Sequence, residues 1–177
     1  MPRIDRLQCA CGQVRLEAEG SPIVGSECYC DSCRAAGARL QALPGAPRLL
    51  DENGGTRFVL YRKDRVRFTN GAGRLAEFRL TPGSSTRRAV ASCCNTPIFL
   101  EFQNGHWLSV YGGLWPEGTL PRLQLRTMTG DLPDPSVLPD DDVARGRLPF
   151  FAKLLGAWIA MGFRSPKITL VRGGIDA

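Results

Sequence analysis

The chain has 177 residues, of which 43% are hydrophobic and 23% charged, and this size and composition indicate one globular domain and argue against disordered, collagen-like or coiled-coil chains. The net charge of +6 comes from basic residues spread along the chain without a dense run, which argues against a nucleic-acid partner. Seven cysteines cannot all pair, and the first six residues lack the apolar core of a secretory signal, so we expect a cytoplasmic protein whose cysteines bind metal rather than form disulfides.

Short alternating segments between Gly and Pro turns predict a body of mainly antiparallel β-strands. Residues 14–18 alternate apolar and charged side chains, and an extended segment at 23–28 runs into a cluster of cysteines. Turn signals bound each later segment, including Asn104-Gly105 at a predicted hairpin. We expect further strands at 57–61, 65–69, 75–80, 87–91, 97–102 and 106–111.

Two helices are predicted in addition to the strands. A short one covers residues 33–40, with Asp31 and Ser32 as N-cap candidates. The second covers 149–163, which is too short for a transmembrane span. We expect it to pack on the sheet, the alternative being contact with a membrane surface or a partner. The residues expected to be buried are Phe151, Leu155, Trp158 and Ile159.

The cysteines form three groups whose spacing indicates zinc, which takes four tetrahedral ligands at a structural site. The groups are Cys9 and Cys11; Cys28, Cys30 and Cys33; and Cys93 and Cys94. Neighbouring residues of a strand point to opposite faces, so Cys93 and Cys94 share one ion only if the chain turns, which Asn95-Thr96-Pro97 permits. With a turn, the thiols divide into a closed site of four and an open site of three. Without one, Cys93 faces the middle cluster and completes it.

The pattern resembles the glutathione-dependent formaldehyde-activating enzyme family, which includes the related centromere protein V. The resemblance covers roughly residues 7–102 and is carried by Cys9-Ala10-Cys11-Gly12, Cys28-Tyr29-Cys30-Asp31-Ser32-Cys33-Arg34 and Cys93-Cys94-Asn95-Thr96. It implies a β-tent fold of packed sheets and a structural zinc held by the outer cysteines. It also implies a second, catalytic zinc at Cys28, Cys30 and Cys33 that receives a thiol, and carbon–sulfur lyase chemistry that joins glutathione to formaldehyde.

The last motif departs from the family's C-x-x-C-G-T pattern. Aligning Cys94-Asn95-Thr96 with the final positions puts Ala91 where the family has its first cysteine, so Cys93 has to substitute from a different backbone position. Residues 1–113 are expected to form the zinc-binding β domain. Residues 114–177 are expected to form an extension with a helix, packed on the same domain.

Three further residues are candidates for binding the substrate. Glutathione carries two carboxylates that guanidinium groups match, so Arg34 and Arg39 are expected to bind them, the alternative being solvated charges on a helix. Tyr29 either donates a hydrogen bond to the substrate or packs. His106, the only histidine, is expected at the surface of a hairpin, which leaves no Cys-His dyad. The alternative function is a non-catalytic binding module in which both metals are structural.

Overall fold

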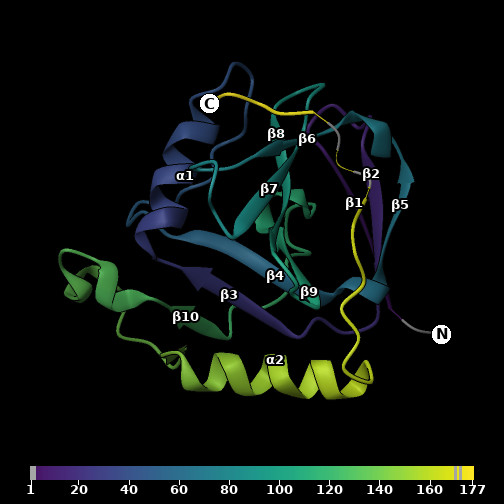
Figure 1. Cartoon of the computed structure of the whole chain (residues 1–177). Helices are drawn as coiled ribbons and strands as arrows, with labels where there is room; N and C mark the ends of the chain where they lie inside the picture. Colours follow the sequence, from purple (N-terminus) through teal and green to yellow (C-terminus); the bar gives the residue numbers. More distant parts are fainter. Residues whose placement is uncertain (1–2, 170, 172) are drawn as a thin grey trace.

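The computed structural model describes residues 3–169, 171 and 173–177, so Met1, Pro2, Leu170 and Arg172 lie outside the described residues. Figure 1 shows two β-sheets with one helix on each of two sides. The strands are β1 (Ile4–Gln8), β2 (Arg15–Glu19), β3 (Val24–Cys28), β4 (Thr56–Arg62), β5 (Val66–Asn70), β6 (Leu75–Phe78), β7 (Thr86–Ala91), β8 (Thr96–Phe102), β9 (Trp107–Tyr111), β10 (Leu125–Thr127) and β11 (Ala144–Arg145). The helices are α1 (Asp31–Gln41) and α2 (Leu148–Ala160).

The sheets differ in size and pack against each other. The smaller one has the order β1-β2-β5, and the larger one has the order β11-β10-β3-β4-β9-β8-β7-β6. Neighbouring strands are antiparallel except that β10 runs parallel to β3 and β11. Apolar side chains of both sheets form one core, in which Leu16 and Ala18 of β2 join Ile98 and Val110 of the larger sheet. The mainly β fold of packed antiparallel sheets is confirmed.

Helix α1 begins two residues earlier than predicted, and its N-cap differs from the expected residues. The cap is Cys30, whose Sγ accepts the Cys33 amide proton at 3.3 Å, rather than Asp31 or Ser32. A thiol thus takes the role that a hydroxyl or carboxylate oxygen usually has. The helix buries Ala36 and Leu40, which are spaced four residues apart, against the body of the protein.

The C-terminal helix α2 is present, but the prediction of its buried face is wrong. The four residues expected to be buried are between 36% and 55% exposed, whereas Leu154 is only 3% exposed. The apolar side chains surround most of the helix, and periodicity alone does not select which side faces the sheet. Within the described part of the chain, no helix is long and apolar enough to cross a membrane.

His106 decides which side of α2 faces the body, and the expectation that it lies at the surface is wrong. The side chain is only 6% exposed, and its Nε2 donates a hydrogen bond to the carbonyl oxygen of Leu154 at 2.8 Å. Its ring stacks on Trp158 with the ring centroids 5.7 Å apart. The histidine therefore holds the middle of α2 against the β8–β9 hairpin.

Candidate metal centres and adjoining cavity

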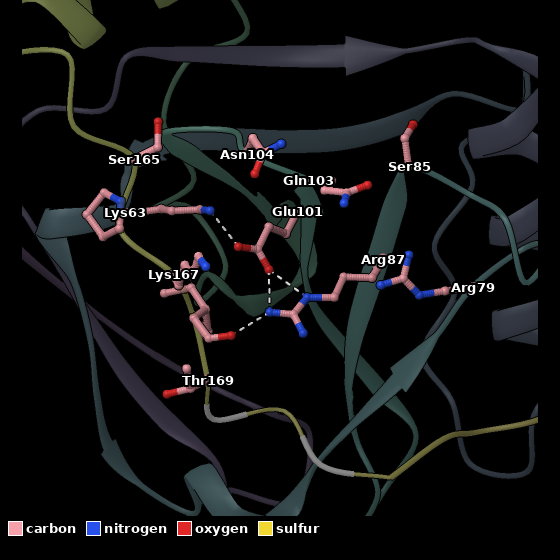
Figure 2. A pocket seen from close by; sticks show the side chains of 12 residues that line it. Lys63, Arg79, Ser85, Arg87, Glu101, Gln103, Asn104, Ser165, Lys167 and Thr169 are labelled. Atoms are coloured by element: carbon pink, nitrogen blue, oxygen red, sulfur yellow. Dashed lines mark hydrogen bonds and ion pairs between the residues drawn. The ribbon is translucent and has the colours of Figure 1, made fainter.

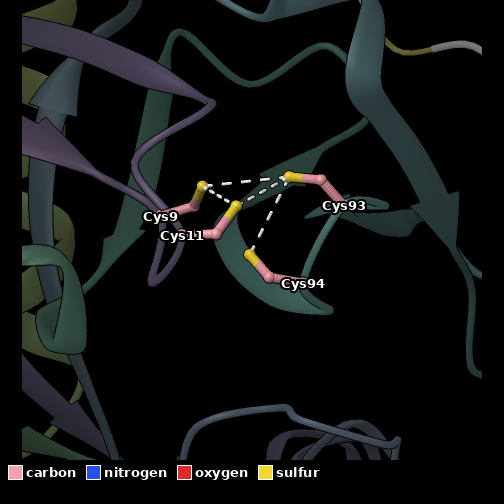
Figure 3. Close-up of side chains that lie close together, drawn as sticks. All are labelled: Cys9, Cys11, Cys93 and Cys94. Atoms are coloured by element: carbon pink, nitrogen blue, oxygen red, sulfur yellow. Dashed lines mark hydrogen bonds between the residues drawn. The ribbon is translucent and has the colours of Figure 1, made fainter.

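The first candidate centre brings together four thiols that are distant in sequence. Cys9 and Cys11 lie between β1 and β2, and they face Cys93 and Cys94 between β7 and β8 (Figure 3). The Cys9 Sγ lies 3.5 Å from the Cys11 Sγ and 4.0 Å from the Cys93 Sγ. The Cys11 Sγ lies 3.3 Å from the Cys93 Sγ, and the Cys93 and Cys94 Sγ atoms are 3.9 Å apart.

The chain turns between β7 and β8, as the sequence permits. The Cys94 amide donates to the Ala91 carbonyl at 3.2 Å, and Asn95 adopts a left-handed conformation with φ of 53°. Asparagine tolerates that region better than most residues. The turn lets Cys93 and Cys94 face the same way, so Cys93 lies with Cys9 and Cys11 and the alternative placement at the middle cluster is not observed.

The geometry of this cluster fits a tetrahedral zinc ion. Four thiolates about 2.3 Å from one metal are separated by about 3.8 Å, and all four Sγ atoms lie within 4.8 Å of one another. Thr96 supports the cluster from behind, because its Oγ1 accepts the Ala10 amide proton and lies 3.1 Å from the Cys94 Sγ, to which its own proton can be donated. Such outer contacts orient metal ligands.

The second candidate centre is built by one local segment where β3 meets α1. Cys28 ends the strand, Cys30 caps the helix and Cys33 lies in the first turn. The Cys28 and Cys30 Sγ atoms are 3.5 Å apart, and all three Sγ atoms lie within 4.8 Å of one another. Three thiolates at this spacing fit a zinc ion whose fourth position is free for another ligand.

The three thiols share their protons unequally when no metal is bound. Hydrogen bonds from the Cys28 and Cys33 thiols hold the pKa of Cys30 far below its ordinary range. Hydrogen bonds with Cys28 and Cys30, together with burial, raise the pKa of Cys33. One thiolate is thus ready to bind a metal ion, and full coordination releases the remaining protons, so metal affinity increases with pH.

A cavity of about 390 Å³ adjoins the three-thiol cluster. Its walls include apolar side chains of the large sheet, such as Phe58, Leu60 and Leu100, and the hydroxyl groups of several Ser and Thr residues. The first turn of α2 closes one side through Phe150 and Phe151. The thiols that line the cavity are those of Cys28, Cys30 and Cys33.

The comparison with known families agrees with this arrangement. The model of the family described as "Glutathione-dependent formaldehyde-activating enzyme" matches residues 6–46, a segment that contains the first two groups of cysteines. The predicted resemblance to this family is confirmed over this segment. A crystal structure of a Rhodobacter sphaeroides protein, a structural genomics target, is 17% identical and covers 66% of this chain and 92% of its own, with a TM-score of 0.46. No curated protein matches the chain.

The three predicted substrate-binding residues lie outside the lining of the cavity. The Tyr29 hydroxyl contacts carboxylate oxygens of Glu27 and Asp51 at 3.1 Å each, and burial followed by these charges raises its pKa. Arg34 donates to the Asp131 carbonyl, and Arg39 donates to the Ala177 carbonyl at 2.6 Å. Substrate binding by Tyr29, Arg34 and Arg39 stays a prediction without a supporting contact.

Sequence reasoning missed a buried arginine that lines the cavity. Arg88 belongs to β7, is 1% exposed, and donates through Nη2 to the Ser32 carbonyl at 3.2 Å. Its Nη1 is buried without a hydrogen-bond partner. The signal in the sequence is a strand that alternates Arg88 and Val90 on one face, but no pattern within a single strand reveals that this face meets the cysteines.

A second cavity of similar size, about 390 Å³, is lined by more charged side chains (Figure 2). Several of these side chains pair with one another. The Glu101 carboxylate receives Lys63 Nζ at 2.5 Å and the Arg87 guanidinium at 2.6 Å. Arg87 also donates to the Ile168 carbonyl at 2.6 Å. These contacts fasten the segment after α2 to the sheet, so the paired charges have a structural explanation.

Proposed function

We propose that this protein is a zinc-dependent carbon–sulfur lyase that joins a thiol such as glutathione to formaldehyde or a related small aldehyde. The observation that carries the proposal is the cluster of three thiols lining a cavity large enough for a small molecule. Cys28, Cys30 and Cys33 would hold the catalytic zinc. Cys9, Cys11, Cys93 and Cys94 would hold a structural zinc, because four protein thiolates leave no open position.

The reaction forms one carbon–sulfur bond. The thiolate sulfur donates its electron pair to the aldehyde carbon, the carbon–oxygen π bond breaks, and the resulting alkoxide takes a proton from solvent or a hydroxyl group. The thiol proton leaves when the sulfur is bound, so the product is a neutral hemithioacetal and the protons balance. Zinc, when bound, supplies the positive charge that keeps a ligated thiol deprotonated near neutral pH.

The chain's own residues contribute positioning and solvent exclusion. Phe58, Leu60 and Leu100 form apolar walls that limit the access of water, which competes for the aldehyde. The hydroxyl groups of Ser26 and Ser109 lie in the same cavity and are donors of the kind that a developing alkoxide requires. Holding thiol and aldehyde in one small cavity replaces a bimolecular encounter by a local one.

Cobalt substitution tests the open coordination position. We expect the thiolate-to-cobalt absorption of the three-thiol site to increase when glutathione is added and to be lost selectively in Cys28→Ser. Formation of the adduct from glutathione and formaldehyde, followed by NMR, should exceed the spontaneous rate in the wild type. A spectrum that already shows four thiolates at this site and does not respond to glutathione would support the alternative of a binding module with two structural metals.

We also propose that residues 114–177 belong to the same domain as residues 1–113. Two contacts support this: β10 pairs with β3 inside the large sheet, and α2 supplies part of the cavity wall. The seven free thiols support a reducing compartment such as the cytoplasm.

A further inference from the structure

We propose that Arg88 binds a carboxylate of the thiol substrate at the inner end of the cavity. This inference rests on the proposed function and adds a specificity for anionic thiols. Its starting point is two observations: the buried Nη1 of Arg88 lacks a hydrogen-bond partner, and Arg88 lines the cavity together with Cys28, Cys30 and Cys33.

Arg88 differs from the other buried cations of this protein. Among the described residues, the cationic side chains in the buried class are Lys63, Arg88 and Arg126. Lys63 pairs with Glu101, and Arg126 pairs with Asp141 at 2.6 Å. Arg88 has no carboxylate partner in the part of the chain that the structure describes. A guanidinium stays charged at any ordinary pH, and a buried charge is stable only when it is compensated.

The surroundings of Arg88 leave two sources for the compensating charge. One is the metal cluster, because three thiolates and a divalent ion carry a net charge of about −1. The other is an anionic group on a bound thiol. The unused Nη1 favours the second source, because a guanidinium fork provides parallel donors that match the two oxygens of a carboxylate. No acidic side chain is among the described residues lining the cavity, so an incoming carboxylate meets no like charge there.

The position of Arg88 relative to the cluster determines how far the carboxylate of the ligand can lie from its sulfur. Its Nη2 donates to the carbonyl of Ser32, a residue that lies between Cys30 and Cys33. A carboxylate bound to Arg88 is therefore close to the sulfur that the three-thiol site receives. Glutathione combines both groups in one molecule.

The test compares glutathione with glutathione diethyl ester, in which both carboxylates are masked, as ligands of the cobalt-substituted protein. We expect the wild type to bind glutathione about tenfold to a hundredfold more tightly than the diester, since charged hydrogen bonds are worth that much. Arg88→Met should remove most of this preference without changing the affinity for the diester. Arg88→Lys keeps the positive charge and should retain part of the preference. It keeps the test informative if Arg88→Met does not fold.

Arg122→Met is the matched control, because Arg122 is an exposed arginine outside the lining of the cavity. It should leave the preference within about twofold of that of the wild type. Equal affinity of the wild type for the two thiols would overturn the role of Arg88 while leaving the proposed function standing. Loss of metal from Arg88→Met, or an equal loss of both affinities, would assign Arg88 to the cluster instead. Failure of the wild type to bind either thiol would overturn the proposed function as well.

A second inference has an independent basis, an exposed apolar stripe along α2. We infer that this stripe binds an anionic lipid surface. Its apolar side chains are Leu148, Phe151, Leu155 and Ile159, all exposed, which recur at helical spacing along α2. Helix α2 lies along one edge of the molecule (Figure 1), and Leu148, Phe151 and Leu155 line an open groove between the helix and the β8–β9 hairpin.

The net charge of the protein resides in the same segment. Residues 143–175 contain six cationic side chains and no acidic one. The rest of the chain has equal numbers of each, 17 cationic and 17 acidic, so the net charge of +6 comes entirely from this segment. A second copy of the chain would bring like charges together across a twofold interface. Binding of a nucleic acid would not explain the apolar stripe. An anionic membrane surface matches both features.

Vesicle co-sedimentation tests this inference. We expect binding to phosphatidylcholine vesicles that contain phosphatidylserine, weakened by added salt, and little binding to phosphatidylcholine alone. Replacing both Leu155 and Ile159 by Ser should lower the binding constant about tenfold or more, whereas Leu120→Ser, at an exposed position far along the chain, should not. Absence of vesicle binding, or binding that the double variant retains, would overturn the inference. A dimer in light scattering that the double variant dissociates would assign the stripe to self-association.

Discussion

Replacing Cys11 should reveal how strongly the four-thiol centre stabilises the fold. The side chain of Cys11 is exposed, so its replacement by Ser costs little packing and reports on the metal. We expect Cys11→Ser to lose one zinc ion per chain. We also expect it to be substantially less stable, because at such sites the free energy of metal binding is also free energy of folding.

The separation of the ligands along the chain gives the magnitude of the expected loss of stability. Cys11 and Cys93 are 82 positions apart, and a cross-link of that span lowers the entropy of the unfolded chain by the equivalent of about 4–5 kcal/mol. For a chain of this size, that corresponds to a decrease in Tm of about 9–18 °C. The cross-link inside the three-thiol centre closes only the short segment from Cys28 to Cys33, so the same relation gives about 2 kcal/mol, or about 4–9 °C.

Cys28→Ser is therefore the matched comparison for Cys11→Ser. Zinc content by elemental analysis and Tm by calorimetry, both with and without a chelator, provide the measurements. Each variant should lose one zinc ion, and the loss of Tm in Cys11→Ser should be about twice that in Cys28→Ser. Equal Tm values for Cys11→Ser and the wild type, with unchanged zinc content, would refute a metal at the four-thiol centre. Equal losses in the two variants would refute the argument from chain entropy.

Three further perturbations test the packing that supports the sites. Gly25→Ala should lower the free energy of unfolding by about 1–3 kcal/mol in urea denaturation, because its methyl group would collide with a backbone oxygen of the segment before β10. Glu101→Gln should cost about 3–5 kcal/mol in the same assay, because it leaves Lys63 buried without its carboxylate. Burial, with Lys63 nearby, lowers the pKa of His106 in the folded protein. As pH falls, the unfolded chain therefore takes up the proton first. The stabilisation that the neutral histidine provides is complete above about pH 6.5 and is lost below it. His106→Gln should flatten that part of the stability profile.

Each of these changes has a control in the same chain. Gly113→Ala adds a methyl group to open space and should change stability by no more than about 0.5 kcal/mol. Asp142→Asn removes one partner of the exposed pair with Arg122 and should cost less than about 1 kcal/mol. Effects as large as those of Gly25→Ala and Glu101→Gln at these control positions would show that the stated contacts do not explain the losses. A pH profile that His106→Gln leaves unchanged would contradict the role of the histidine.

Most of the β body was predictable because local signals agree with the tertiary structure. Alternation in residues 14–18 corresponds to the buried side of β2, and Asn104-Gly105 is the turn between β8 and β9. Strands β1, β10 and β11 were missed; β10 and β11 have only three and two residues, which carry no measurable period. The buried face of α2 was wrong because a helix apolar on most sides needs an external partner, here His106, to fix its rotation.

The candidate sites were predictable to the extent that their residues are neighbours in sequence. The spacing of Cys28, Cys30 and Cys33 indicates a shared metal because one short segment builds the whole cluster. Joining Cys9 and Cys11 to the distant Cys93 and Cys94 required the turn at Asn95 to be anticipated, which the sequence permits but does not require.

Arg88 shows where such reasoning ends. It is brought to the cysteines only by the packing of β7 against the start of α1, where its side chain meets the carbonyl of Ser32. A metal centre formed by one local segment has ligands that any fold would keep together, whereas the group facing its open position depends on the tertiary structure. The proposed metal centres are thus predictable from short motifs, whereas the proposed substrate preference depends on the strands that surround them.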